Sequence, residues 1–467
     1  MTVQITEVST VYGLATVCAA LDAGLLASSG PVRRVLVTST NTAVPEATPS
    51  WEERLGFAVL RKRFDEVISW NDAIHPNHPW DWSPRPCDIP LLQRVLSSSW
   101  GIGPEEPVSL VVESIQTSPG QALARVFSDS PIHVYADGLM AYGPLRSRIP
   151  HQVLQRIEDL VHPDLVPGLR PLVLDEAAFG HSTPAHRAIP HDALRSVFAE
   201  LARTREAADV VAPLRGGEAP AVILGQYLSA AGIISAQEED RLHLRMLRQA
   251  AEAGHRHVVF KAHPSAPGTQ TEALCKSAAD LGVEFRSTTA PVPAEVLFQE
   301  VRPSAVIGCF STGLFTARTL YGIPAFRVGT ETVLSGLRPY SNSNRIPLAI
   351  AYAGLSSPSL PPHNKDRGGA PVGGDDPGPL VRTLTYCMHP QAYPQLRRDA
   401  EQFLAQHKGS AVVRRNVGLG RLTRLRLPGG LPIGPLGDRL LTSHRLSPAL
   451  RRAWRSYRNL RRRVPLS

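Results

Sequence analysis

The feature that most constrains the fold is an alternation of short apolar runs with helical stretches, which occurs in two successive series. Each run has four or five residues, and most are rich in valine and isoleucine, as expected for buried strands connected by crossover helices. The predicted strands are residues 5–8, 34–38, 66–70, 108–112 and 132–135 in the first series and 221–224, 257–261, 283–286 and 305–308 in the second. This pattern predicts an α/β protein with two Rossmann-like domains.

The length of the chain, 467 residues, is too great for one compact core and favours several domains. The two series predict an N-terminal Rossmann-like domain at residues 1–211 and a second one at 212–355. Residues 356–379 are dominated by proline, glycine and serine and predict a flexible linker. Residues 380–467 are expected to form a helical region followed by an arginine-rich tail.

The composition and the spacing of the cysteines limit the classes of protein to which this chain can belong. A hydrophobic content of 43% is enough for buried cores and excludes global disorder. The five cysteines are scattered and show no CxxC spacing, which favours a reducing compartment. The first ten residues have no basic segment and include Glu7, so a secretory signal is not expected. These features predict a cytoplasmic protein.

The excess positive charge is concentrated in the tail. Residues 411–467 contain 14 arginines and one acidic residue, although the net charge of the whole chain is only +9. Within residues 445–464, apolar residues recur every three or four positions, and this spacing predicts an amphipathic helix. Its predicted surface residues are Arg451, Arg452, Trp454, Arg455, Arg458, Arg461, Arg462 and Arg463. Such a helix suits the inner, anionic face of a membrane, where the protein would bind peripherally. Packing against the N-terminal domain is one alternative, and nonspecific nucleic-acid binding, which is the less favoured partner, is another.

Three polar motifs follow predicted strands of the two series. They are Asp137-Gly138, Lys261 to Pro264, and Ser311 to Gly313. In an open parallel sheet, ligands bind outside the carboxyl ends of the strands. The shared placement of these motifs therefore predicts that they contribute to ligand sites.

The first motif suits acid–base chemistry. Asp137 follows a strand directly, and Gly138 would form a tight turn that leaves the carboxylate in a crevice. A carboxylate in that position can act as a general base towards a hydroxyl group. The alternative is an Asx-turn with only a structural role.

The other two motifs suit phosphate binding. His263, held in an extended conformation by Pro264 and lying near Lys261, could bind or protonate a leaving phosphate. An ordinary surface histidine is the alternative. Ser311 and Thr312 precede an apparent helix, whose N-terminal N–H groups favour a phosphate. Plain N-capping by these hydroxyls is equally compatible with the sequence.

Taken together, the three motifs resemble those of the bacterial sialyltransferases, and most closely the polysialyltransferase-type group. The matching segments are Ala136-Asp137-Gly138, His263-Pro264 and Ser311-Thr312, within a resemblance that runs from about residue 108 to 328. The resemblance implies a GT-B fold, with two facing Rossmann-like domains around a central cleft, and inversion at the anomeric carbon.

The resemblance also implies roles for individual residues. Asp137 would be the general base, and His263 would contact the donor phosphate and assist its departure. Ser311 and Thr312, with Gly313, would bind the same phosphate, and Glu295 would hold the nucleotide. The family pattern has two acidic residues before the glycine, whereas this chain has Ala136 before Asp137. This departure puts the identity of the base in question.

The expected reaction transfers sialic acid, or a related nonulosonic acid, from a CMP-activated donor to a hydroxyl of a glycan or lipid-linked glycan. No metal or other cofactor is expected, because a CMP-sugar carries a single phosphate and the chain has no Asp-x-Asp triplet. Two alternatives stay open. One is a GT-B transferase that uses another nucleotide-activated donor, and the other is a catalytically inactive nucleotide-binding or membrane-associated protein.

Overall fold

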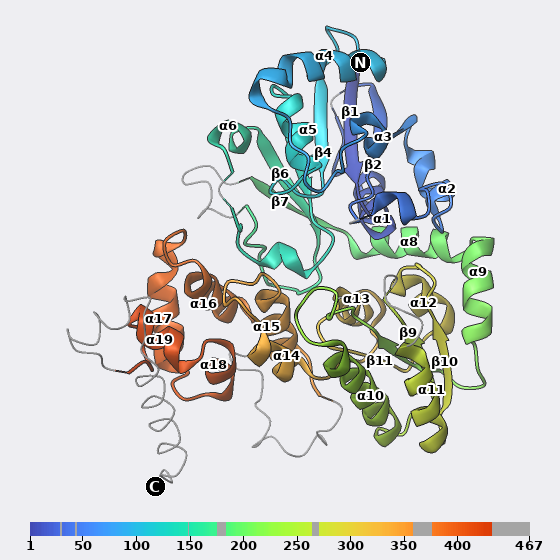
Figure 1. Ribbon diagram of the computed structural model, residues 1–467, viewed down its shortest axis with the longest axis vertical. Helices are drawn as coiled ribbons and strands as arrows, with labels where there is room; N and C mark the ends of the chain where they lie inside the picture. Colours follow the sequence, from blue (N-terminus) through green and yellow to red (C-terminus); the bar gives the residue numbers. More distant parts are fainter. Residues whose placement is uncertain are drawn as a thin grey trace. The chain divides into compact units, whose positions relative to one another are not determined.

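The N-terminal part of the chain forms a seven-stranded parallel sheet. The computed structural model describes residues 1–28, 30–42, 44–147, 149–174, 184–263, 270–357 and 376–431 (Figure 1). The strand order is β3-β2-β1-β4-β5-β6-β7, in which the order reverses between β1 and β4. The strands are β1 (Thr2–Val8), β2 (Val32–Thr38), β3 (Glu66–Ser69), β4 (Val108–Val112), β5 (Ile132–Tyr135), β6 (Ile157–Pro163) and β7 (Ala185–Ile189). This order is that of a Rossmann-type sheet.

A five-stranded parallel sheet follows in the sequence and has the same kind of reversal in its strand order. Its order is β10-β9-β8-β11-β12, with the reversal between β8 and β11. The strands are β8 (Ala221–Leu224), β9 (His257–Lys261), β10 (Glu284–Thr288), β11 (Ala305–Gly308) and β12 (Ala325–Arg327). The expected α/β architecture with two Rossmann-like sheets is therefore confirmed.

Helices connect the strands, as the parallel pairing requires. Those of the first series are α1 (Val11–Asp22), α2 (Phe57–Leu60), α3 (Trp70–Ile74), α4 (Ile89–Ser99), α5 (Gly120–Val126), α6 (His151–Leu154), α8 (His191–Ala202) and α9 (Arg205–Val211). Those of the second are α10 (Ala236–Glu252), α11 (Gln270–Asp280), α12 (Ala294–Val301), α13 (Thr312–Tyr321), α14 (Thr330–Gly336) and α15 (Arg345–Gly354). Helix α8 packs against both α1 and α12, which links the two series within one compact unit, residues 1–381 (Figure 1).

The core of the first sheet consists of aliphatic strand residues and an aromatic cluster. Trp70 and Trp100 pack edge to face, and Trp100 stacks on Phe127 with their ring centroids 5.8 Å apart. All three aromatic side chains are buried with strand residues such as Val3 and Leu110. Burial of large apolar side chains supplies most of the stabilisation of such a sheet, and this core fixes the strand ends that carry the polar groups described below.

All nine strands expected from the apolar runs are present, but β6, β7 and β12 were not predicted. Strand β6 contains Glu158 and Asp159, and β7 (AHRAI) is polar at the edge of its sheet. Asp159 is buried and pairs with His133 of β5 and Arg187 of β7, so charge pairing replaces apolar patterning in these strands. Strand β12 has only three residues, which is too short for a periodicity signal.

A second compact unit begins at residue 382. The helical region expected from residue 380 to 406 is present as α16 (Gly378–Met388) and α17 (Arg397–Gln406), followed by α18 (Ala411–Asn416) and α19 (Leu419–Leu425). Most of the predicted linker and all of the predicted amphipathic tail helix lie outside the described residues. Within the described ranges, no helix is both long enough and apolar enough to cross a membrane.

Candidate active site

Three acidic residues lie at the carboxyl end of the first sheet, where its strand order reverses. Glu7 is the penultimate residue of β1, Glu113 directly follows β4, and Asp137 follows β5 by two residues. Since β1, β4 and β5 are neighbours in the sheet, these carboxyl groups converge on one edge. Asp137 was predicted from the sequence, whereas Glu7 and Glu113 were not. Glu113 follows an apolar strand, as Asp137 does, so the same pattern could have identified it, but Glu7 lies within its strand.

Hydrogen bonds fix the position of Glu113. Its Oε2 accepts from the main-chain N–H of Ser9 at 3.2 Å and from the Ser9 hydroxyl at 2.5 Å. Its own N–H donates to Oε2 of Glu7 at 3.0 Å. The loop after β4 is thereby tied to the end of β1, and the Glu113 carboxylate has a defined position.

Two carboxyl groups at this edge, those of Asp137 and Glu7, have raised pKa values. Burial, followed by the charge of Glu113, raises the pKa of Asp137 to about 7, against the opposing effect of a main-chain hydrogen bond. Burial and the charge of Glu113 also raise the pKa of Glu7 to about 8. A carboxylate with a pKa near neutrality is well matched to removing a proton from a hydroxyl group.

Basic groups lie at the carboxyl end of the second sheet. Lys261 is the last residue of β9 and is buried, and burial lowers its pKa while the charge of Glu295 opposes the shift. His263 follows two residues later and is exposed to solvent. Partial burial of its ring and the charge of Lys261 lower the pKa of His263, and Glu239 acts in the opposite direction. Pro264, the other residue of this motif, lies outside the described residues.

The loop after β8 is built around a buried glutamate. Glu239 of α10 accepts hydrogen bonds from the main-chain N–H groups of Leu228 and Ser229 and from the Ser229 hydroxyl. This arrangement holds Tyr227 with its ring centroid 6.4 Å from that of His263. Tyr227 was not predicted as a site residue from the sequence.

Glu295 lies in the first turn of α12 and is buried. It accepts a hydrogen bond from the Thr316 hydroxyl at 2.5 Å. Burial raises its pKa, whereas Thr316 and the charge of Lys261 lower it. The residue expected to hold the nucleotide therefore interacts electrostatically with the lysine expected near the phosphate.

Ser311 is the N-cap of α13, and its side chain accepts from the N–H of Gly313 at 3.2 Å. Ser311 therefore caps helix α13, which is the alternative role proposed for this motif from the sequence. Thr312 makes a different contact, since its hydroxyl accepts a long hydrogen bond of 3.5 Å from the N–H of Leu139. Leu139 belongs to the segment that follows Asp137, so Thr312 reaches the first motif.

The close approach of Gly138 to Thr312 brings two predicted motifs together. A Cβ atom on Gly138 would lie 2.8 Å from Oγ1 of Thr312, closer than real side chains allow. Gly138 has an extended backbone and starts the short 3-10 turn Leu139–Tyr142. The expected turn is present, but the glycine is required by this contact rather than by a left-handed conformation. The segments that carry Asp137 and Ser311 therefore touch although they are far apart in the sequence.

Tyr12, in the first turn of α1, interacts electrostatically with one acidic residue from each of the two series. Burial and the charges of Glu295 and Asp137 raise its pKa well above the usual value, so it stays neutral. Its ring stacks on Phe198 of α8 at a centroid distance of 5.6 Å. Tyr12 was not predicted as a site residue, because no local sequence pattern distinguishes it from an aromatic residue of the core.

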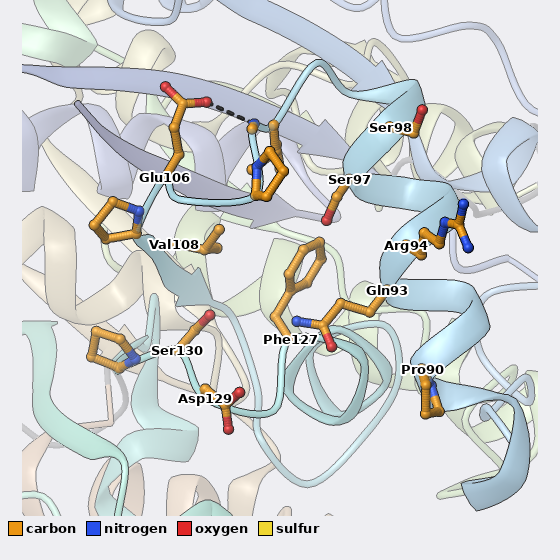
Figure 2. A pocket seen from close by; sticks show the side chains of 15 residues that line it. Pro90, Gln93, Arg94, Ser97, Ser98, Glu106, Val108, Phe127, Asp129 and Ser130 are labelled. Carbon is orange, nitrogen blue, oxygen red and sulfur yellow. Dashed lines mark hydrogen bonds between the residues drawn. The ribbon is translucent and has the colours of Figure 1, made fainter.

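The pocket in Figure 2 lies at the opposite edge of the first sheet from Asp137. Its volume is about 750 Å³, and its walls include Val108 at the start of β4 and Ser130 before β5. Arg94, the basic residue among those lining it, points away from Phe127. The pocket is therefore separate from the site formed by the strand carboxyl ends. Among the residues that the structure describes, no group of three or more His, Cys, Asp or Glu side chains is arranged to hold a metal ion.

Two Rossmann-type sheets, with acidic residues at the carboxyl edge of the first and with Lys261 and the Ser311 cap at that of the second, form an architecture that is compatible with a glycosyltransferase. The sequence matches the model of the alpha-2,8-polysialyltransferase family (POLYST) over residues 4–330. The chain therefore belongs to the alpha-2,8-polysialyltransferase family. Membership of a sialyltransferase family implies a nucleotide-sugar donor and a glycan acceptor. No curated protein matches the sequence.

Solved structures similar to this chain include two sialyltransferases. The GT-B domain of a sialyltransferase from Photobacterium damselae is 12% identical, with 68% of this chain and 88% of that chain covered and a TM-score of 0.40. An alpha/beta-galactoside alpha-2,3-sialyltransferase from Photobacterium phosphoreum is 11% identical, with 75% and 95% covered and a TM-score of 0.41. MurG from Acinetobacter baumannii is 12% identical, with 85% and 94% covered and a TM-score of 0.38.

Proposed function

We propose that this glycosyltransferase moves sialic acid, or a related nonulosonic acid, from a CMP-activated donor to a hydroxyl of a glycan acceptor, with inversion at the anomeric carbon. The main support for this proposal is the contact between Gly138 and Thr312. This contact brings the acidic motif next to the motif that is expected to bind phosphate. The family assignment supports sialyl transfer in particular.

On the acceptor side, Asp137 is the proposed general base. In the reaction the acceptor O–H bond breaks, its proton passes to the Asp137 carboxylate, and the oxygen forms a bond to the anomeric carbon. The raised pKa of Asp137 favours this role because a carboxylate with a pKa of about 7 binds a proton more readily than an ordinary one. Ala136 packs against the core of the first sheet and has no polar atom to offer.

On the donor side, the bond from the anomeric carbon to the CMP phosphate breaks as CMP leaves with the electron pair. Lys261, His263 and the N-terminus of α13 supply the positive character that stabilises this phosphate. Without donor, the pKa of His263 is lowered, so the imidazole is neutral near pH 7. A bound phosphate would raise that pKa, because a negative charge favours the protonated ring. Protonation of His263 is then coupled to donor binding.

The proposal includes no catalytic metal. The leaving group carries one phosphate, and Lys261 and His263 suffice to balance its charge. We also propose a cytoplasmic location, with the arginine-rich tail bound to an anionic membrane surface near a lipid-linked acceptor.

Calorimetric titration of CMP, UMP, GMP and CDP into the wild type and His263→Ala tests the donor site. We expect selective binding of CMP that weakens about tenfold or more in His263→Ala, consistent with the loss of a charge-assisted hydrogen bond. His151→Ala, at an exposed histidine of α6, is the matched control and should bind like the wild type. Equal binding of all four nucleotides would contradict the CMP assignment, and a transfer assay with CMP-sialic acid then tests catalysis directly.

A further inference from the structure

Glu7 and Glu113 are buried or half-buried acidic groups that the proposed mechanism does not use. Glu7 is only 1% exposed, and its Oε1 has no hydrogen-bond partner among the residues that the structure describes. An ionised carboxylate in such a place is strongly disfavoured, whereas the protonated form is tolerated. The raised pKa of Glu7, about 8, agrees with a neutral carboxyl group near pH 7.

Glu113 differs from Glu7 because its environment supports a carboxylate. Two donors of Ser9 converge on one of its oxygens, and hydrogen bonds of this kind stabilise the charged form. Its side chain is half-buried on the edge that also carries Asp137, from the neighbouring strand β4. The edge therefore combines a deeply buried Glu7 with a half-buried Glu113 whose carboxyl group is held in place by hydrogen bonds.

We propose that Glu113 is a positioning residue of the transfer reaction, whose carboxylate, held in place by Ser9 and by its main-chain bond to Glu7, lies on the same sheet edge as Asp137 and strengthens it as the base. Glu113 does not touch the reacting atoms. This inference rests on the proposed function, since it assumes that Asp137 removes the acceptor proton.

The other titratable groups around Asp137 are uncharged. Tyr12 faces it from α1 and Tyr135 faces it from β5, and burial raises the pKa of both tyrosines well above the usual value. Among the described residues, Glu113 is the group whose charge acts on the pKa of Asp137. Removal of that charge should therefore lower the pKa of Asp137 and make it a weaker base.

The test is the pH dependence of kcat/KM for Glu113→Gln, together with an infrared titration of the Asp137 carboxyl group, identified by its loss in Asp137→Asn. Glutamine keeps an oxygen acceptor for Ser9 but has no charge. We expect the acidic limb of the profile and the infrared midpoint both to move down by about 1 pH unit. The rate at the alkaline plateau should fall, because a weaker base accelerates less.

The matched control is Glu105→Gln, at an exposed glutamate that precedes β4, and it should leave the acidic limb in place. Ser9→Ala, which releases Glu113 from its side-chain hydrogen bond, is a second test if Glu113→Gln does not fold, and it should move the midpoint in the same direction. An unchanged Asp137 midpoint in Glu113→Gln, with Asp137→Asn inactive, overturns this inference alone. Full activity of Asp137→Asn overturns both the inference and the assignment of the base.

Discussion

Replacing Gly138 with alanine would place a methyl group against Thr312. The added Cβ would lie 2.8 Å from Oγ1 of Thr312 and 3.8 Å from its Cβ. The first distance requires a shift of the backbone or of the threonine, and overpacking of this kind typically costs about 1–3 kcal/mol. We therefore expect the free energy of unfolding, measured by urea denaturation, to fall by that amount. Transfer activity should fall further, because the shift separates Asp137 from the donor-side motif.

A double-mutant cycle tests the cause of this loss. In Thr312→Ala the nearest atom to the new methyl group is Cβ at an ordinary contact distance, so Gly138→Ala should cost much less in that background. We expect a coupling free energy of about 1–2 kcal/mol. Gly217→Ala is the control, since no atom lies within 4 Å of the position that its added methyl group would occupy, and it should not destabilise the protein. Additive effects of the two changes would refute the contact between the motifs.

Three further predictions concern acidic residues. Asp137→Asn should lower kcat about 10²–10⁴-fold, and the wild-type kcat/KM should fall below pH 7 as the base is protonated, as a pH-rate profile will show. Glu239→Ala leaves two main-chain N–H groups of the loop after β8 without their acceptor and should cost about 2–4 kcal/mol in denaturation experiments. Glu238→Ala, which removes an exposed capping-box residue of the same helix, should destabilise the protein less. Glu7 has a raised pKa in the folded state, so it destabilises the protein increasingly as the pH rises from about 4.5 to 8. The stability of Glu7→Gln relative to the wild type, measured by urea denaturation at several pH values, should therefore increase with pH in that window.

Local patterns were sufficient to predict nine of the twelve strands in the two sheets. Strands such as Val108–Val112 and His257–Lys261 are apolar throughout most of their length because parallel strands are buried on both faces. Strand β6 escaped detection because its buried Asp159 is stabilised by His133 and Arg187 from neighbouring strands. The sequence contains no local sign of that pairing, which depends on the three-dimensional arrangement of the strands.

The candidate site shows the same division between local and long-range information. The position of Asp137 after a strand was readable from the sequence, and so was the capping potential of Ser311. The proximity of Glu113 to Asp137 depends on the order of strands β1, β4 and β5, which apolar patterning does not specify. The need for glycine at position 138 likewise arises from Thr312, a residue that follows a strand of the other sheet.

The reversal of strand order occurs in both sheets, but the two carboxyl edges carry opposite chemistry. On the first, Glu113 and Asp137 create a negative environment that raises proton affinity, which is what a base acting on a hydroxyl requires. On the second, Lys261 and the N-terminus of α13 add positive character beside the buried Glu295, as the proposed departure of a phosphate requires. If the base of the proposed reaction shared one edge with Lys261, the lysine would lower the pKa of that base. In the proposed reaction the two sets of groups instead follow separate sheets, and the contact of Gly138 with Thr312 brings them together.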